Sequence, residues 1–129
     1  MASSNPYSYA ILRAVPRIER GERMNVGVVL FSRPAQFLGV RTALDEPRLL
    51  ALWPGADAEG MRLHLAALER IAAGDPGAGP VSGFDQTARF HWLTAPSSTI
   101  IQPSRLHSGL CGEPEAELER LFASLVGVP

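Results

Sequence analysis

The stretch Val26-Gly27-Val28-Val29-Leu30-Phe31 decides the fold of this chain. It is a continuous apolar run of strand length, which is typical of a β-strand covered on both faces. The polar, proline-containing residues 32–36 predict a turn, and residues 37–41 resume as a strand. We therefore expect a hairpin, with residues 26–31 as the central strand of a sheet.

Two more strands are predicted on either side of this hairpin in the sequence. Residues 7–15 alternate aromatic or branched side chains with smaller ones, and Pro16 ends the run. Residues 98–102 also have strand composition and are ended by Pro103. The sequence thus predicts three to four strands.

Beyond Leu44 the apolar period changes from two to about 3.6, which indicates helices. Three of the four predicted helices have a start signal, either an acidic cap or a proline in the first turn. The four helices are 45–53, capped by Asp45 or Glu46; 57–73, capped by Asp57; 86–93, where a strand is the alternative; and 114–126, starting at Pro114. The glycine- and proline-rich residues 74–83 predict a flexible loop inside the domain.

Together these elements predict one domain with a two-layer α+β fold. We expect an antiparallel sheet of three to four strands, with helices mainly on one face and the order β-β-β-α-α-α-β-α. Residues 1–6 are expected to be a disordered lead-in, and residues 7–129 to form the domain. The last helix is expected to dock on the sheet through its apolar face, formed by Leu118, Leu121, Phe122, Leu125 and Val126.

The composition excludes several chemistries and suggests a location. All twelve basic residues are arginines, so this chain has no Walker phosphate loop, no Schiff-base amine and no kinase-type phosphate-binding lysine. No apolar run approaches the ~20 residues of a membrane span, and the first residues lack the features of a secretory signal. Because Cys111 is the only cysteine, no internal disulfide can form. We therefore predict a cytoplasmic protein with no membrane segment.

Charge is distributed unevenly along the chain. Residues 1–44 contain six arginines and two acids, a net charge of +4, whereas residues 45–129 have a net charge of −5. A basic N-terminal face would favour an anionic partner, although the two halves can equally attract each other.

No complete catalytic or metal-binding pattern occurs in the sequence. The glycine-rich residues 77–83 follow a predicted helix rather than a strand, unlike a phosphate-binding loop. Proximity of Cys111 to His107 does not make a nucleophilic pair, because such partners are usually distant in sequence. None of the histidines has the close spacing of a shared metal site: His64, His91 and His107. We predict no metal and no cofactor, leave catalytic residues unknown, and favour a protein that is not an enzyme.

The most unusual stretch is Arg17-Ile-Glu-Arg20-Gly-Glu22-Arg23-Met-Asn25-Val-Gly27, whose charges and glycines directly precede the most apolar strand. Gly27 within a central strand predicts a β-bulge or the close approach of another segment. Arginine forks suit carboxylate or phosphate groups, and Glu22 could orient one. The candidate binding residues are Arg13, Arg20, Glu22, Asn25 and Arg89. The alternative is a solvated connection in which Arg20 and Glu22 pair with each other.

Four blocks of the sequence, covering nearly the whole chain, carry a resemblance to a known family. They are Tyr9-Ala-Ile-Leu-Arg13; Arg20-Gly-Glu22 with Asn25-Val-Gly-Val-Val-Leu-Phe31; Arg89-Phe-His-Trp92-Leu-Thr-Ala-Pro96; and Pro114-Glu-Ala-Glu-Leu-Glu-Arg-Leu-Phe122. The chain resembles the bacterial family known as domain of unknown function 3037 (DUF3037). The family brings no established activity and no catalytic residues. The resemblance implies a partner, a HipA-like kinase-fold protein encoded beside some members.

Three functions follow from these observations. The first is an interaction or regulatory module that acts with another protein, favoured by the absence of a concentrated catalytic set. The alternatives are an enzyme with a dispersed active site and a nucleic-acid-binding module that uses the basic N-terminal region.

Overall fold

The computed structural model describes residues 4–97 and 99–127, and a five-stranded antiparallel sheet lies at its centre. β1 (Asn5–Ala14) pairs on one side with β2 (Met24–Ser32). On its other side it pairs with two short strands, β4 (Ile101–Pro103) and β5 (His107–Cys111). β3 (Phe37–Thr42) pairs with β2 and forms the opposite edge of the sheet.

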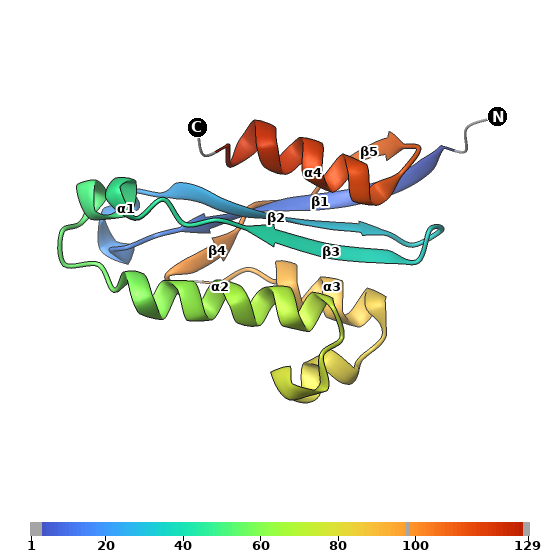
Figure 1. The fold of residues 1–129 in the computed structure, drawn as a ribbon, viewed down its shortest axis with the longest axis horizontal. Helices are drawn as coiled ribbons and strands as arrows, with labels where there is room; N and C mark the ends of the chain where they lie inside the picture. The colour runs from blue at the N-terminus through green and yellow to red at the C-terminus, as the bar shows by residue number, and fades with distance from the viewer. Residues whose placement is uncertain (1–3, 98, 128–129) are drawn as a thin grey trace.

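Helices cover both faces of this sheet (Figure 1). α2 (Ala58–Ala72) and α3 (Gln86–Thr94) lie on one face, and α4 (Pro114–Leu125) lies on the other. The short α1 (Glu46–Leu52) lies at one end of the sheet. The α+β class and the antiparallel sheet are confirmed. The predicted two layers, with helices mainly on one face and at most four strands, are corrected to three layers and five strands.

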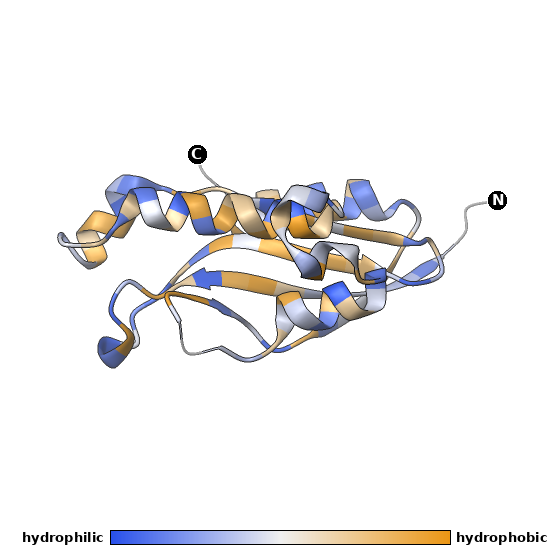
Figure 2. Ribbon diagram, turned by 90° about the horizontal axis from the view of Figure 1, so that it is seen from below, coloured by the Kyte–Doolittle hydropathy of each residue, from blue (hydrophilic) through white to orange (hydrophobic). Residues whose placement is uncertain are grey.

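The side chains of β2 explain the third layer. Val29 and Phe31 are buried in the core beneath α2 and α3, whereas Val28 and Leu30 are buried against Leu118 and its neighbours on α4. Figure 2 shows the strands largely orange and the helices alternating between orange and blue. A strand that is apolar on both faces needs cover on both, because each buried aliphatic side chain contributes ~1.5–3 kcal/mol.

Gly27 lies at an irregularity in β2. The register of β1 against β2 shifts between Leu12 and Arg13, which leaves Val26 as the extra residue of a β-bulge. A Cβ atom on Gly27 would also lie 2.8 Å from the backbone carbonyl oxygen of Arg41 in β3. The predicted bulge or close approach is confirmed, and both occur.

The starts of α1 and α2 agree with the predicted caps, and Asp85, which was not predicted, caps α3 in the same way. Asp45, Asp57 and Asp85 each accept a hydrogen bond from the backbone N–H three residues further on, at 3.2, 2.9 and 2.8 Å. These aspartates satisfy donors that the first turn of a helix leaves free. The ambiguous segment 86–93 is helical, as favoured. On α4, Leu118, Leu121 and Val126 are buried, while Phe122 and Leu125 are partly buried.

Several segments differ from the prediction. β1 begins at Asn5, so the end of the predicted lead-in belongs to the sheet; residues 1–3 lie outside the described residues. β4 starts at Ile101, and Ser98 of the predicted strand is also outside them. β5 was not predicted.

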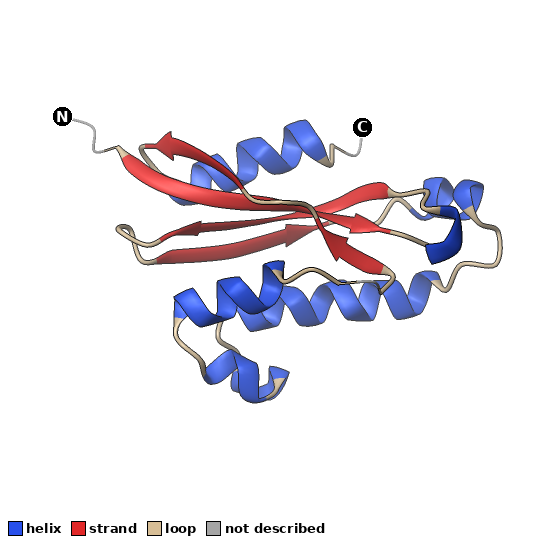
Figure 3. Ribbon diagram, turned by 180° about the vertical axis from the view of Figure 1, so that it is seen from behind, coloured by secondary structure: helices blue, strands red, loops and turns tan. Residues whose placement is uncertain are grey.

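Residues 74–83, predicted as a flexible loop, contain two 3₁₀ turns. These are η2 (Pro76–Ala78) and η3 (Pro80–Gly83), which lie beyond α2 and α3, away from the sheet (Figure 3). The carboxylate of Asp75 starts the first turn by accepting the N–H of Gly77 at 2.9 Å. Within the described part of the chain, no helix has the length and apolarity needed to cross a membrane.

Candidate interaction surface

The five residues proposed from sequence lie in three separate places. Arg20 and Glu22 flank Gly21, which has a φ of 72° and follows the 3₁₀ turn η1 (Ile18–Arg20). Their side chains are exposed and form an ion pair at 2.6 Å between Nε and Oε1. The neighbouring Arg17 pairs with Glu19, and its guanidinium lies 4.3 Å from the ring centre of Trp53. The loop's charges are therefore largely used within the loop itself.

Arg13 and Asn25 are brought together by the sheet. They are cross-strand partners on β1 and β2, on the face that α4 covers. Asn25 donates from Nδ2 to the carbonyl oxygen of Leu125 at 2.9 Å, which ties the end of α4 to the sheet. Burial, with the nearby Arg23, lowers the pKa of the Arg13 guanidinium. Asn25 therefore has a structural function in holding α4.

Arg89 lies on the opposite face of the sheet, on α3. Its Nη1 donates to the carbonyl oxygens of Ile71 and Ala72 at 3.0 and 2.7 Å, and its Nε donates to that of Phe84 at 2.9 Å. The first two carbonyls belong to the last turn of α2, where a cation is favourable. Arg89 thus joins α3 to the end of α2 and does not share a site with Arg13 or Arg20.

A group of ionisable side chains lies where α4 meets β1 and β5. The Tyr7 hydroxyl donates to Oε2 of Glu117 at 2.5 Å, and Arg120 binds the same carboxylate at 2.6 Å. Burial, followed by the bond to Glu117, raises the pKa of Tyr7 to about 12. Burial also raises the pKa of the nearby Cys111 thiol. A tyrosine or cysteine nucleophile is activated by a lowered pKa, so this group is better suited to holding α4 in place.

This cluster predicts a distinct alkaline dependence of stability. Because the pKa of Tyr7 is raised from 10.0 to about 12 on folding, its contribution is complete below pH 10 and is lost as the pH rises through 12. We expect wild type to exceed Tyr7→Phe in free energy of unfolding by about 2 kcal/mol at pH 8, with the difference shrinking above pH 10. Urea denaturation across pH 8–12 measures it, with Tyr9→Phe as the matched control. Parallel curves for wild type and Tyr7→Phe would contradict it.

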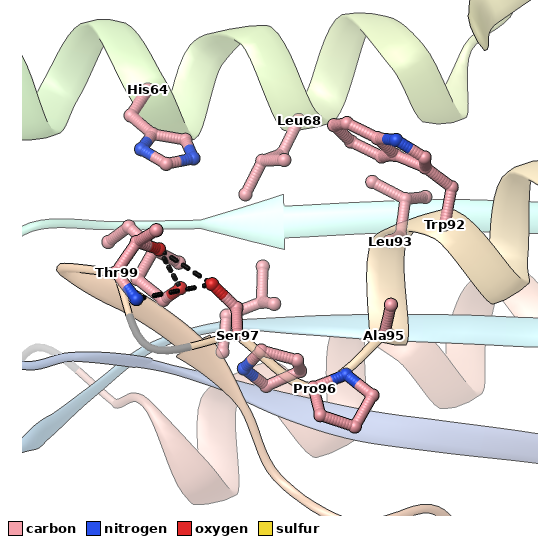
Figure 4. A pocket seen from close by; sticks show the side chains of 11 residues that line it. His64, Leu68, Trp92, Leu93, Ala95, Pro96, Ser97 and Thr99 are labelled. Atoms are coloured by element: carbon pink, nitrogen blue, oxygen red, sulfur yellow. Dashed lines mark hydrogen bonds between the residues drawn. The ribbon is translucent and has the colours of Figure 1, made fainter.

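A cleft lies between α2, α3 and the connection to β4 (Figure 4). Its volume is about 270 Å³, and its walls are mostly apolar. His64 and Leu68 enter from α2, and Trp92 from α3, while Pro96 closes the near side. The side chain of Trp92 is 47% exposed although it lies on a well-formed helix.

Two polar side chains at this cleft, Ser97 and Thr99, are bonded to each other. The hydroxyls of Ser97 and Thr99 lie 2.8 Å apart, and Thr99 Oγ1 also donates to the carbonyl oxygen of Ile101 at 3.0 Å. These bonds stabilise the turn into β4 and leave an apolar floor. In the residues that the structure describes, no three His, Cys, Asp or Glu side chains gather as a metal site.

A second hollow continues the cleft. It has a volume of about 500 Å³ and shares Pro96 and Pro103 with the first, and Leu106 on its far side is 49% exposed. We call the combined region, defined by Trp92, Pro96, Pro103 and Leu106, the α3–β4 surface. Sequence reasoning missed it. The available signal was that a helix burying Phe90 and Leu93 must turn Trp92 towards solvent.

Fold and surface together define an α+β domain with an apolar surface beside an exposed tryptophan. The chain belongs to the family described as protein of unknown function (DUF3037), whose family model matches residues 9–126. This match confirms the resemblance seen in the sequence. No curated protein and no solved structure matches the chain.

Proposed function

We propose that this protein is a small cytoplasmic interaction module that binds another protein through the α3–β4 surface. The observation that carries the proposal is the exposed Trp92 beside a proline-lined apolar cleft. Tryptophan is strongly enriched among the residues that dominate binding energy at protein interfaces. An apolar patch of this kind in water marks a surface that a partner covers.

The lining of the cleft favours a protein over a small molecule. Its walls are mostly apolar, and two of its polar side chains, Ser97 and Thr99, bond each other. Small-molecule sites use a few free polar groups to orient the ligand. An apolar side chain projecting from a partner protein suits this space, with Leu106 and Pro103 extending the contact.

The charges and pKa shifts support this choice over the two alternatives. Three of the six arginines in residues 1–44 are paired with glutamates, namely Arg17, Arg20 and Arg41, which weakens the basic face that nucleic acid would need. The raised pKa values of Tyr7 and Cys111 do not favour an enzyme. A HipA-like kinase-fold protein, which the family resemblance implies, is the first partner to test.

The experiment compares binding of wild type and Trp92→Ala. Proteins of the native host retained by each are identified, and the partner, with the HipA-like protein tested first, is purified for calorimetry. We expect Trp92→Ala to weaken binding by about 2 kcal/mol or more, roughly 30-fold, because the anchor is lost. Its thermal stability should change little, since half of the side chain is already exposed.

The matched control is Leu110→Ala, which removes another large exposed side chain on β5, away from the cleft. Binding by this variant should equal that of wild type. Equal binding by Trp92→Ala and wild type would overturn the proposal, as would retention of nucleic acid alone.

A further inference from the structure

The outer edge of β3 is not covered by another described strand. β3 lies at the end of the sheet, and of the described strands it pairs with β2 alone. The backbone N–H of Ala43 donates to Val26 of β2 at 2.9 Å, whereas the N–H of Thr42 turns away and donates to Glu69 on α2 at 2.9 Å. Backbone groups alternate in direction along an antiparallel strand. The N–H and C=O groups of Val40 and Leu38 therefore point outwards, like those of Thr42.

A groove of about 260 Å³ runs along these outward groups. Residues 37–41 of β3 form its floor, α2 contributes one wall, and α4 contributes the other. Among the outward N–H groups of the described β3 residues, the Glu69 carboxylate accepts that of Thr42 alone, at the end of the groove. The remaining groups match the hydrogen-bonding pattern of an extended peptide that adds a strand to an exposed edge.

The walls of the groove are acidic. Glu69 stands on the α2 wall, and Glu115 and Glu119 stand on the α4 wall, against a single cation, Arg41. Arg41 is already paired with Glu119 at 3.0 Å. Side chains of an added strand alternate between the two walls, so positive residues would find a carboxylate on either side.

We propose that the β3 edge binds an extended, arginine- or lysine-rich segment of another protein by strand addition. A second copy of this chain is the poorer occupant, because pairing two β3 edges would place the acidic walls of both copies together. Acidic walls beside an open edge discourage such self-association. The β3 edge is also at the opposite side of the sheet from β4 and the α3–β4 surface, so the two sites can be tested independently.

The test uses the intact protein and short capped peptides of arginine and valine in which two neighbouring arginines face opposite walls of the groove. We expect saturable changes in the backbone amide NMR signals of Leu38 and Val40, with slower hydrogen exchange at both. A peptide with glutamate in place of arginine should bind at least ~10-fold more weakly, because like charges then face each other. An arginine–valine peptide that is N-methylated on its strand-pairing amides should not protect these amides.

A protein variant separates charge from backbone pairing. Glu115→Gln removes a wall charge without touching β3 and should weaken binding several-fold, whereas Glu59→Gln, at the far end of α2, should not. Equal binding of the N-methylated peptide, or no change at Leu38 and Val40, would overturn strand addition. Concentration-dependent changes at these amides without peptide would instead assign the edge to a second copy, which also overturns the proposal.

Discussion

Leu118→Ala is expected to lower the free energy of unfolding by ~2–5 kcal/mol, because it opens a cavity between α4 and the sheet. Leu118 is 4% exposed and packs with Val28 and Leu30. It also lies close to Gly39, because a Cβ atom added to Gly39 would be 2.8 Å from Cδ2 of Leu118. Urea denaturation gives the difference. The matched control is Leu63→Ala, an exposed leucine on α2, which should change stability by much less.

This experiment also tests whether α4 belongs to the cooperative core. Removal of the chain after Gly112 should eliminate the folding transition, since Val28 and Leu30 would lose their cover. A truncated protein that unfolds at the wild-type temperature would show that α4 is an appendage, and equal stabilities of Leu118→Ala and Leu63→Ala would show the same.

Gly27→Ala is the second substitution with a large expected effect, a loss of ~1–3 kcal/mol. The new methyl group would lie 2.8 Å from the carbonyl oxygen of Arg41 and 3.2 Å from Leu12 Cδ1. The carbonyl belongs to β3, so it can move only by disturbing the pairing of β3 with β2. The overpacking therefore has to be relieved in the sheet.

Gly83→Ala is the control for this substitution. Nothing lies within 4 Å of a Cβ placed at Gly83, so this change should leave stability nearly unaltered. Thermal unfolding of the two variants measures the contrast. Similar melting temperatures for Gly27→Ala and wild type would mean that the bulge absorbs the methyl group and that the close approach places no constraint on residue 27.

The sequence was sufficient for elements whose signals are local. The caps Asp45 and Asp57 bond within three residues of themselves, so α1 and α2 could be located without knowing the rest of the fold. The two-sided apolar pattern of β2 also correctly predicted cover on both faces. The prediction that the helices lie mainly on one face was inconsistent with this pattern.

Features that depend on distant partners could not be predicted in the same way. β5, with residues His107–Cys111, has no strong strand pattern and forms by pairing with β1. The side chains of Arg89 and Asn25 could be recognised from the sequence as hydrogen-bond donors. Their acceptors could not, because these are backbone carbonyls of α2 and α4 that only the fold brings close. Both side chains were predicted to bind a ligand, but in the structure they bind the protein itself.

The position of β1 in the sheet has a consequence during synthesis on the ribosome. β1 is the first strand made, yet one of its sides is completed only by β4 and β5. Ile11 bonds to a residue 93 positions later, and Asn5 to one 107 positions later. A nascent chain containing only β1, β2 and β3 therefore has a bare strand edge and two uncovered apolar faces. Such chains are prone to pair with one another, so slow translation of the second half should favour aggregation over native folding.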